Sequence, residues 1–352
     1  MKDNIYDMIN DGKFENEDYD VEILNDMEKK KYKNNIRKSI GGSTVKARKR
    51  YKGIAAAMVF VVLGTGFLST DAGAQVMLDM SESIGSALRT DKNIDDYKTV
   101  INKCVSDNGV NIQLNEVVLA KNKLIISTDI SSDKLLKDDE MYDADKTIYI
   151  NDKKVRFTGQ TGSAGKVDDY TSESVMEYDL DSVNEEDLNG EIDIKIIYTK
   201  VSLYGDKSSV RGKWKFEFKT SRDNLMADTY EEDIDYEFTL DNGEKVILEK
   251  YMSNAVGQNI YARVENSNTK ERDNVMLKGH DDLGNEVDFY LSRGREGYMD
   301  FRYNNYDRNI DDNAKTLTLT PYAVKMPEGN GKMPDSDEYI KVGESFDISI
   351  NK

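Results

Sequence analysis

The side chains that most often perform nucleophilic catalysis are scarce in this sequence. The chain has 352 residues but only one cysteine, Cys104, and one histidine, His280. A nucleophilic cysteine needs a base beside it to form its thiolate, and these two residues lie far apart in the sequence. We therefore expect Cys104 to be a small core or surface thiol. His280, in the polar run HDDLGNE, is expected to lie in a loop.

The low content of cysteine and histidine also limits which groups the chain could bind. A disulfide framework, a Cys-rich zinc site and a multi-histidine metal centre each need more of these residues than the chain has. The sequence contains no phosphate-binding loop, dinucleotide fingerprint or serine nucleophile elbow. We expect a protein that is not an enzyme and that has neither a catalytic residue, a metal nor a cofactor.

Acidic side chains, in contrast, are abundant, with 67 Asp and Glu against 49 Lys and Arg and a formal net charge of −18 at pH 7. Carboxylate pairs are so frequent that none of them indicates glycosidase chemistry. Nucleic-acid binding is disfavoured because phosphate contacts need clustered cations. Weak calcium binding stays open, although no cluster has the EF-hand spacing. Solvated loops are favoured for the acidic clusters at 138–140, 168–169, 281–282, 311–312 and 335–338.

The elements that would position any site begin with an uneven distribution of charge. Residues 1–28 contain ten acids and two bases, whereas residues 29–52 contain eleven bases and no acid. The next eighteen residues, 53–70, carry no charge. As a helix this run spans about 27 Å, close to the ~30 Å hydrocarbon core of a bilayer. We predict a transmembrane helix at 53–70, and a buried core helix is the alternative.

The bases that precede the uncharged run set its expected orientation. By the positive-inside rule they place the N-terminus in the cytoplasm and the later residues outside the cell membrane. A cleaved signal peptide is a second alternative, because Ala72-Gly73-Ala74 has the form of a cleavage site, but signal peptides have much shorter leaders. The membrane-flanking residues in this interpretation are Lys46, Arg48, Lys49, Arg50 and Lys52.

The cytoplasmic segment, 1–52, has the pattern of short helices. The second of these predicted helices, at 21–40, has acidic residues near its N-terminal end and basic residues near its C-terminal end. The helix dipole favours this arrangement. One interpretation is an amphipathic partner-binding segment within 1–40, and the other is a solvated tether whose basic end lies on the membrane. The candidate partner-binding residues are Leu24, Met27, Tyr32, Ile36 and Ile40.

Residues beyond the predicted membrane helix change from helical to alternating periodicity. The run 76–88 has apolar residues at i+4 spacing and predicts a short amphipathic helix. From about residue 108, short β-branched and aromatic segments separated by turn signals, among them KVRF (154–157), predict antiparallel strands. The segment GKWKFEFK (212–219) alternates most clearly, and Trp214 is expected to anchor a core. We predict a first β-rich ectodomain at 75–222.

A polar, acidic stretch at 221–233 predicts a domain boundary. Strand patterns resume at DYEFTL (235–240) and continue to SFDISI (345–350), which indicates a second β-sandwich at 233–352. Pro321 is expected at an edge or a bulge, because proline cannot donate to a ladder. The fold class is thus mainly β, with two extracytoplasmic antiparallel sandwiches after one transmembrane helix and a short cytoplasmic helical segment.

The layout resembles a known family of bacterial membrane proteins. The features that carry the resemblance are the acidic-then-basic leader, one anchor after KARKRYK, the GKWKFEF strand, and a late strand in AKTLTLTPYAV. The family is named for a domain of unknown function, DUF4179. Its members carry this domain together with a C-terminal immunoglobulin-like domain. The resemblance implies an anti-sigma-factor-like regulator. Residues 1–52 lack the His and Cys of zinc-type anti-sigma domains, so any sigma-factor binding would use metal-free helices.

These observations predict a single-pass membrane protein with a cytoplasmic N-terminus. Its expected function is to couple an extracytoplasmic β domain to a cytosolic partner, with a sigma factor bound through 1–40 as the candidate. The alternative is a surface binding or adhesion module for which the leader is only a tether. The sequence does not indicate the extracellular ligand.

Overall fold

A computed structural model of the chain describes residues 84–138, 140–204, 208–267, 273–306, 309–326, 334–335 and 337–350. The chain divides by contacts into Met1–Gly53 and Ile54–Lys352, and all described residues belong to the second unit. The predicted cytoplasmic segment and the predicted transmembrane helix lie outside the described residues. Within the described ranges, no helix is long and apolar enough to cross a membrane.

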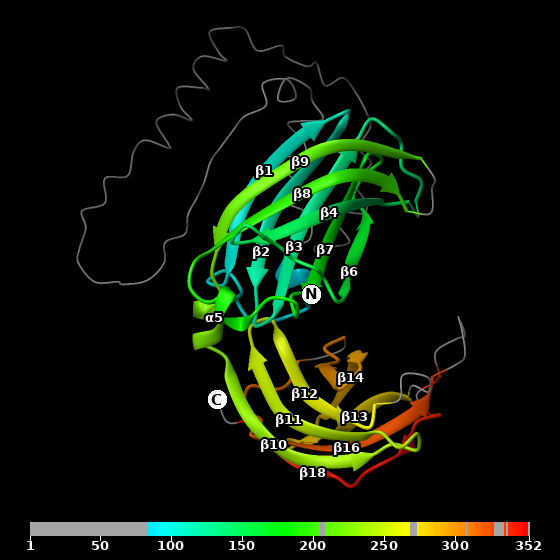
Figure 1. The fold of residues 1–352 in the computed structure, drawn as a ribbon. Coiled ribbons are helices and arrows are strands. Elements are labelled where there is room, and N and C mark those ends of the chain that lie inside the picture. Colours follow the sequence, from blue (N-terminus) through cyan, green and yellow to red (C-terminus); the bar gives the residue numbers. More distant parts are fainter. Residues whose placement is uncertain are drawn as a thin grey trace, which may run out of the picture. The chain divides into compact units, whose positions relative to one another are not determined.

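The first part of the described chain, which we call the first β region, consists of nine strands in two antiparallel sheets (Figure 1). One sheet has the order β1-β2-β3-β7-β6 and the other the order β5-β4-β8-β9. Buried residues from both sheets form a single hydrophobic core. The strands are β1 (Lys98–Asp107), β2 (Val110–Leu119), β3 (Lys123–Ser132), β4 (Tyr142–Ile150), β5 (Lys153–Lys154), β6 (Gln160–Lys166), β7 (Thr171–Asp179), β8 (Ile192–Leu203) and β9 (Ser209–Thr220).

Alternating side chains explain why these segments form a two-layered core. In β9, Trp214 and Phe216 are fully buried, while the alternate residues Lys213, Lys215 and Glu217 are exposed. The indole Nε1 of Trp214 donates a hydrogen bond of 2.9 Å to the carbonyl oxygen of Val110 on β2, so its one polar atom is satisfied inside the core. The predicted role of Trp214 as a core anchor is therefore confirmed.

Three strands of the first β region, β1, β6 and β7, were not expected from the sequence, and one expected strand is nearly absent. Strands β6 and β7 carry small polar side chains and show little of the alternation that predicts strands. The segment KVRF (154–157), predicted as a strand, contributes only Lys154 to the two-residue β5. Its apolar Val155 is buried, but it packs against the core outside a ladder. Around β5, β6 and β7, the alternation of apolar and polar residues therefore does not predict which segments pair as strands.

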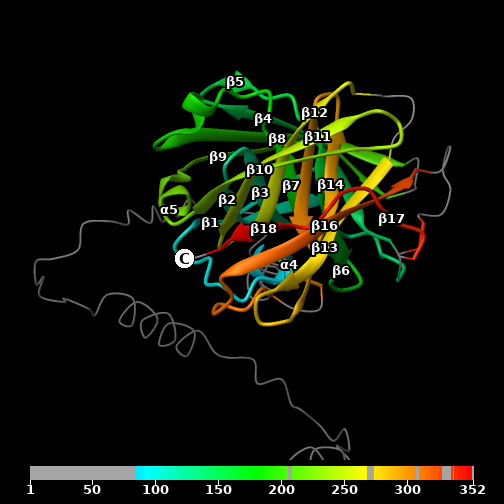
Figure 2. The ribbon, with the colours of Figure 1, turned by 90° about the horizontal axis from the view of Figure 1, so that it is seen from below.

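The second β region follows and forms one continuous sheet (Figure 2). Its order is β10-β11-β12-β15-β14-β13-β16-β17, with β18 also paired to β16. The expected pair of separate sheets is therefore replaced by one hydrogen-bonded path, because β12 pairs with β15 and links the two halves. The strands are β10 (Tyr230–Thr239), β11 (Lys245–Asn254), β12 (Gly257–Glu265), β13 (Asp273–Asp281), β14 (Glu286–Arg295), β15 (Tyr298–Tyr303), β16 (Thr316–Lys325), β17 (Ile340–Lys341) and β18 (Phe346–Ser349).

Pro321 occupies a different place from the one expected. It lies within β16, which has β13 on one side, where Pro321 is opposite Leu277. On the other side, β18 pairs with 316–319 and β17 with Tyr322 and Ala323. Pro321 falls between these two partners, so no ladder bond from its nitrogen is missing. The expectation of an edge or a bulge was wrong, although the physical constraint behind it is obeyed.

Three short helical segments complete the described chain: α4 (Ile84–Ala87), the 3₁₀ helix η1 (Glu185–Leu188) and α5 (Asp223–Ala227). The described part of the predicted helix at 76–88 is α4, and the remainder lies outside the described residues. Helix α5 falls in the predicted boundary stretch, whose last residues already belong to β10. A small hydrophobic cluster gathers around these helices and contains Ile84, Ile94, Val118, Ala120, Ile125, Val175, Leu225 and Ala255. It joins residues of both β regions.

Candidate functional site

The most concentrated charged site in the described residues is a cluster centred on Arg293, near the end of β14. Its Nη1 lies 2.5 Å from Asp179 Oδ1 and 2.9 Å from Asp181 Oδ2, and its Nη2 is bonded to Asp300. Arg295 adds a second contact to Asp181 at 2.9 Å. We call Arg293, Arg295, Asp179, Asp181 and Asp300 the arginine clamp. It joins residues of the first β region to residues of the second.

Aromatic and hydroxyl groups enclose the clamp. The Tyr298 ring lies 5.5 Å from the Arg293 guanidinium carbon and 4.9 Å from that of Arg295, which is within the range of cation–π attraction. The Tyr298 hydroxyl donates to Asp300, which is almost fully buried. Burial and the charge of Asp300 raise the pKa of Tyr298. Tyr298 therefore stays neutral and acts as a hydrogen-bond donor.

Electrostatics within the clamp favour the charged form of Arg293 but not that of Asp179. Burial opposes the charge on Arg293, but Asp300, Asp179 and Asp181 outweigh this effect and raise its pKa. For Asp179 burial dominates and raises the pKa, although Arg293 and Lys123 oppose the rise. One guanidinium thus compensates several carboxylates, which is possible because its planar fork presents several donors at once.

A second buried ion-pair network lies beside the clamp. Glu177, on β7, accepts from Arg302 Nη2 of β15 at 2.5 Å and lies 2.9 Å from Lys123 Nζ of β3. Burial raises the pKa of Glu177, but the charges of Arg302 and Lys123 outweigh it and lower the pKa to about 2. This network also crosses between the two β regions, because Arg302 belongs to the second and Glu177 to the first.

Further contacts between the two β regions surround these ion pairs. The side-chain amide of Asn305 donates to the carbonyl oxygen of Leu88 at 2.7 Å, and the Arg89 guanidinium lies 4.0 Å from the Tyr306 ring centroid. The Lys121 ammonium lies 4.9 Å from the ring centroid of Tyr261. Together with the hydrophobic cluster around α4 and α5, these contacts make a mixed polar and apolar interface.

The clamp and the neighbouring network join the two β regions through ion pairs. The carboxylates of both are held by cations. Burying ionised groups costs free energy unless each is paired. A protein that carries such an interface gains specificity in how its β regions are joined. The site is therefore a joint whose geometry fixes one part of the chain against another.

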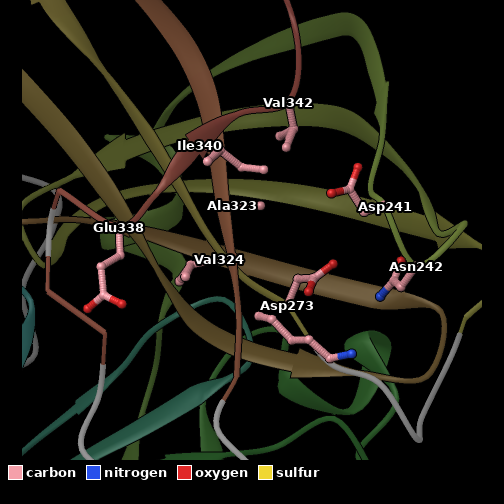
Figure 3. A pocket seen from close by; sticks show the side chains of 9 residues that line it. Asp241, Asn242, Asp273, Ala323, Val324, Glu338, Ile340 and Val342 are labelled. Atoms are coloured by element: carbon pink, nitrogen blue, oxygen red, sulfur yellow. The ribbon is translucent and has the colours of Figure 1, made fainter.

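A separate acidic pocket of about 380 Å³ lies in the second β region (Figure 3). Its polar lining consists of one cationic side chain, Lys325, and of Asp241, Asn242, Asp273 and Glu338, and its apolar surface includes Ile340 and Val342. In Figure 3 the carboxylates of Asp241 and Glu338 lie on opposite sides of the hollow. Among the described residues no three His, Cys, Asp or Glu side chains are arranged to hold a metal ion.

The residues singled out from the sequence are distributed as follows. Cys104 is half-buried on β1, and burial together with Asp129 raises the pKa of its thiol to about 11, which fits an unreactive core or surface thiol. His280 is exposed but lies within β13, opposite Glu286, so its expected loop position was wrong. The stripe Leu24, Met27, Tyr32, Ile36 and Ile40 and the flank Lys46, Arg48, Lys49, Arg50 and Lys52 lie outside the described residues.

Sequence reasoning missed the arginine clamp entirely. Arg293 and Arg295 stand in the strand segment LSRGR, where arginine at every second position places both side chains on one face of β14. Asp179 and Asp181 show the same spacing at the end of β7. Two alternating pairs of opposite charge were the available signal. Neither pair, however, indicates by itself which distant partner it meets.

Two family profiles match parts of the chain. The domain of unknown function DUF4179 matches residues 44–132, from before the predicted membrane helix to the end of β3. The family of unknown function DUF5643 matches residues 230–350, which include every strand of the second β region. The resemblance to the DUF4179 family is thus confirmed for residues 44–132. No curated protein matches the chain.

Several solved structures match the chain, and one of them shares the fold of most of it. It is described as the crystal structure of the conserved domain protein from Bacillus anthracis, and the TM-score is 0.54. The match covers 74% of this chain and 94% of that chain, at 20% sequence identity. The likeness at this level of identity concerns the fold alone, and it spans more than either β region by itself.

Proposed function

We propose that this protein is a single-pass membrane regulator of the anti-sigma-factor-like kind. In this proposal residues 53–70 span the cell membrane, the N-terminus is cytoplasmic, and both β regions are extracytoplasmic. Residues 1–40 hold a cytosolic partner, with a sigma factor as the candidate. The protein does no catalysis and uses no cofactor. The immunoglobulin-like character of the β regions, which the family resemblance suggests, belongs to the same proposal.

The observation that carries the proposal is the order of segments within one profile match. The DUF4179 match begins in the basic flank, includes the uncharged run 53–70 and continues to the end of β3. A basic cluster followed directly by eighteen uncharged residues is the pattern of a membrane helix with its N-terminus inside. The match therefore links that pattern to the β strands that follow it.

The arginine clamp supports the signalling part of the proposal. If the extracytoplasmic domains of a receptor moved independently, a conformational change caused by ligand binding in one of them would not be transmitted to the membrane helix. Here buried ion pairs join the two β regions. The cluster around α4 and the hydrogen bond from Asn305 to Leu88 join the second β region to the segment that begins at Ile84. Because Ile84 directly follows the part of the chain that leads back to residue 70, a displacement of the β regions would reach the membrane helix through few residues.

A surface binding module is the second candidate. It is favoured by the acidic pocket and by the strongly acidic composition, which suit recognition of a cationic group outside the cell. In that case residues 1–52 would only tether the protein. The two functions differ in whether the apolar stripe of the cytoplasmic segment matters.

The test combines topology with partner binding in the full chain. Protease added to intact cells should remove the β regions and leave a fragment that contains residues 1–52. The variant with Leu24, Met27, Ile36 and Ile40 exchanged for serine should lose its co-purifying cytosolic partner, whereas exchange of the polar Asn34 and Asn35 for serine should not. Protection of the β regions from protease would contradict the membrane topology. Equal partner recovery from both variants would favour the tethered module.

A further inference from the structure

Strand β6 lies at one edge of its sheet, and no strand of the described residues pairs with its outer side. It pairs only with β7, in an unbroken register from Gln160 to Lys166. Figure 1 shows it at the outer side of β7. Residues 160–164 are exposed and uncharged. An edge strand presents a row of unpaired N–H and C=O groups that can template pairing with another chain.

The other described edges carry the protections that β6 lacks. Proteins usually blunt an edge with charges, bulges, proline or very short strands. Register shifts interrupt β1, β9 and β10, and β9 and β10 also carry many charged side chains. Strands β5 and β17 have two residues each, and β18, which pairs only with β16, has four. The one charge of β6 is at its end, where Lys166 is 3.0 Å from Asp169.

Hydrogen bonds at both ends of β6 show which of its backbone groups face outward. Asp179 N–H donates to the Gly159 oxygen and Val167 N–H donates to the Thr171 oxygen. In an antiparallel ladder these bonds flank non-hydrogen-bonded pairs, here Gln160–Tyr178 and Lys166–Ser172. The N–H and C=O groups of the alternate residues therefore point away from β7. These residues are Gln160, Gly162, Ala164 and Lys166.

The side chains of this edge allow a close approach. A Cβ atom at Gly162 would lie 2.1 Å from the Val175 oxygen, so β6 lies unusually tightly against β7 at this point. Only small side chains, Gly162 to Gly165, flank the middle of the strand. An incoming strand would meet neither a large side chain nor a charge there.

We propose that β6 is a self-association edge, at which a second copy of this chain adds its own β6 in antiparallel orientation around a two-fold axis at Ser163. This register brings all seven residues into the pairing. Gly162 then exchanges backbone hydrogen bonds with Ala164 of the second copy, and Gln160 does so with Lys166. No like charges face each other, because the single charge is opposite a neutral glutamine.

The inferred association is weak and depends on salt. Seven paired residues bury much less than the ~1,200–2,000 Å² of a typical stable interface. Each copy also carries a formal net charge of −18, so the two chains repel each other at low ionic strength. Dimerisation should therefore increase as salt is added. The inference rests on the edge alone and does not require the proposed function.

Disulfide cross-linking in the full chain tests the register. On a Cys104→Ser background, Ser163→Cys should give a disulfide-linked dimer under mild oxidation, because Cα atoms of a non-hydrogen-bonded pair lie about 4.5 Å apart. Thr161→Cys is the matched control, since its counterpart across the axis would be about 13 Å away. We expect about tenfold more dimer for Ser163→Cys, because cysteines more than about 7 Å apart at Cα cannot be bridged.

A proline variant tests whether the outward backbone groups are used. Ala164→Pro removes an N–H that faces away from β7, so the fold should persist, as the fluorescence of Trp214 would show. In the Ser163→Cys background it should abolish the cross-linked dimer. Equal cross-linking of Ser163→Cys and Thr161→Cys, or a monomer at every salt and protein concentration tested by sedimentation, would overturn the proposal.

Discussion

Nη1 of Arg293 lies 2.5 Å from Oδ1 of Asp179, so one guanidinium joins strand β14 of the second β region to the end of β7 in the first. The same nitrogen also contacts Asp181. The side chains of Arg293 and Asp179 are mostly buried, with 13% and 11% of their surfaces exposed. Removal of Arg293 would therefore leave several poorly solvated carboxylates without a compensating charge. We expect this loss to destabilise the protein more than the loss of any single acid of the clamp.

The first prediction concerns the stability that this cation provides. Arg293→Ala should lower the free energy of unfolding by about 3–5 kcal/mol, because it leaves buried charge unpaired. Arg295→Ala is the matched control, since Arg295 is more exposed and contacts only Asp181 of the acids. Its loss should cost no more than about 1 kcal/mol. Urea denaturation measures both values, and equal losses would contradict the central role of Arg293.

The second prediction concerns cooperativity between the β regions. The one tryptophan of the chain, Trp214, lies in the first β region, so its fluorescence reports unfolding there. In the unaltered protein this transition should coincide with the loss of far-UV circular dichroism, which reports both regions. In Arg293→Ala the two transitions should separate. Coincident transitions in the variant would show that the hydrophobic cluster around α4 and α5 couples the regions without the clamp.

The core of the fold could be predicted from the sequence much better than the clamp could. Alternation in GKWKFEFK identified Trp214 and Phe216 as buried because an apolar side chain tends to be buried whatever its partner is. Arg293 could not be assigned in this way, because its environment is made by Asp179 and Asp181, over a hundred residues earlier in the chain. Strand β6 was missed because its small polar residues form a strand through pairing with β7 and carry little propensity of their own.

The third prediction concerns acid stability. The pKa of Glu177 falls from its ordinary value of 4.5 to about 2 in the folded protein. A carboxyl with a lowered pKa stabilises the fold above its unfolded pKa, and this contribution disappears as the pH drops through the folded pKa. Stability should therefore decline between about pH 4.5 and pH 2, by on the order of 3 kcal/mol. Urea denaturation at successive pH values measures this decline.

A variant of the same residue separates this effect from general acid unfolding. Glu177→Gln cannot titrate, so its stability should be lower at neutral pH and depend less on pH within that window. Asp179 acts in the opposite direction, because its pKa is raised and its protonation favours the fold as the pH falls. A slope in Glu177→Gln as steep as in the unaltered protein would show that other carboxylates govern the acid limb.

The fourth prediction concerns the reactivity of the single thiol. Burial and the nearby Asp129 raise the pKa of Cys104 from 9.0 to about 11. Only the thiolate is nucleophilic, so alkylation by iodoacetamide at pH 8 should be about a hundredfold slower than for a free thiol. The same protein in concentrated urea supplies the reference rate. Rapid labelling of the folded protein would mean that Cys104 is more accessible than its position on β1 indicates.

The last prediction concerns how tightly the core packs around Trp214. A Cβ atom at Gly212 would lie 2.5 Å from the nearest carbon of the Trp214 ring. The ring cannot move away freely, because its Nε1 donates to the Val110 oxygen at 2.9 Å. Gly212→Ala should therefore destabilise the protein by about 1–3 kcal/mol through overpacking. It should also shift the emission of Trp214, because the ring must leave its present environment.

Gly165→Ala is the matched control for this prediction. Gly165 is also a strand glycine of the first β region, but a Cβ there would meet no atom within 4 Å. Since alanine restricts the unfolded chain more than glycine does, this variant should be neutral or stabilised by up to about 1 kcal/mol. Urea denaturation followed by Trp214 fluorescence compares the two. If Gly212→Ala proved as stable as Gly165→Ala, the core would have space for a methyl group beside the ring of Trp214. That result would contradict the prediction.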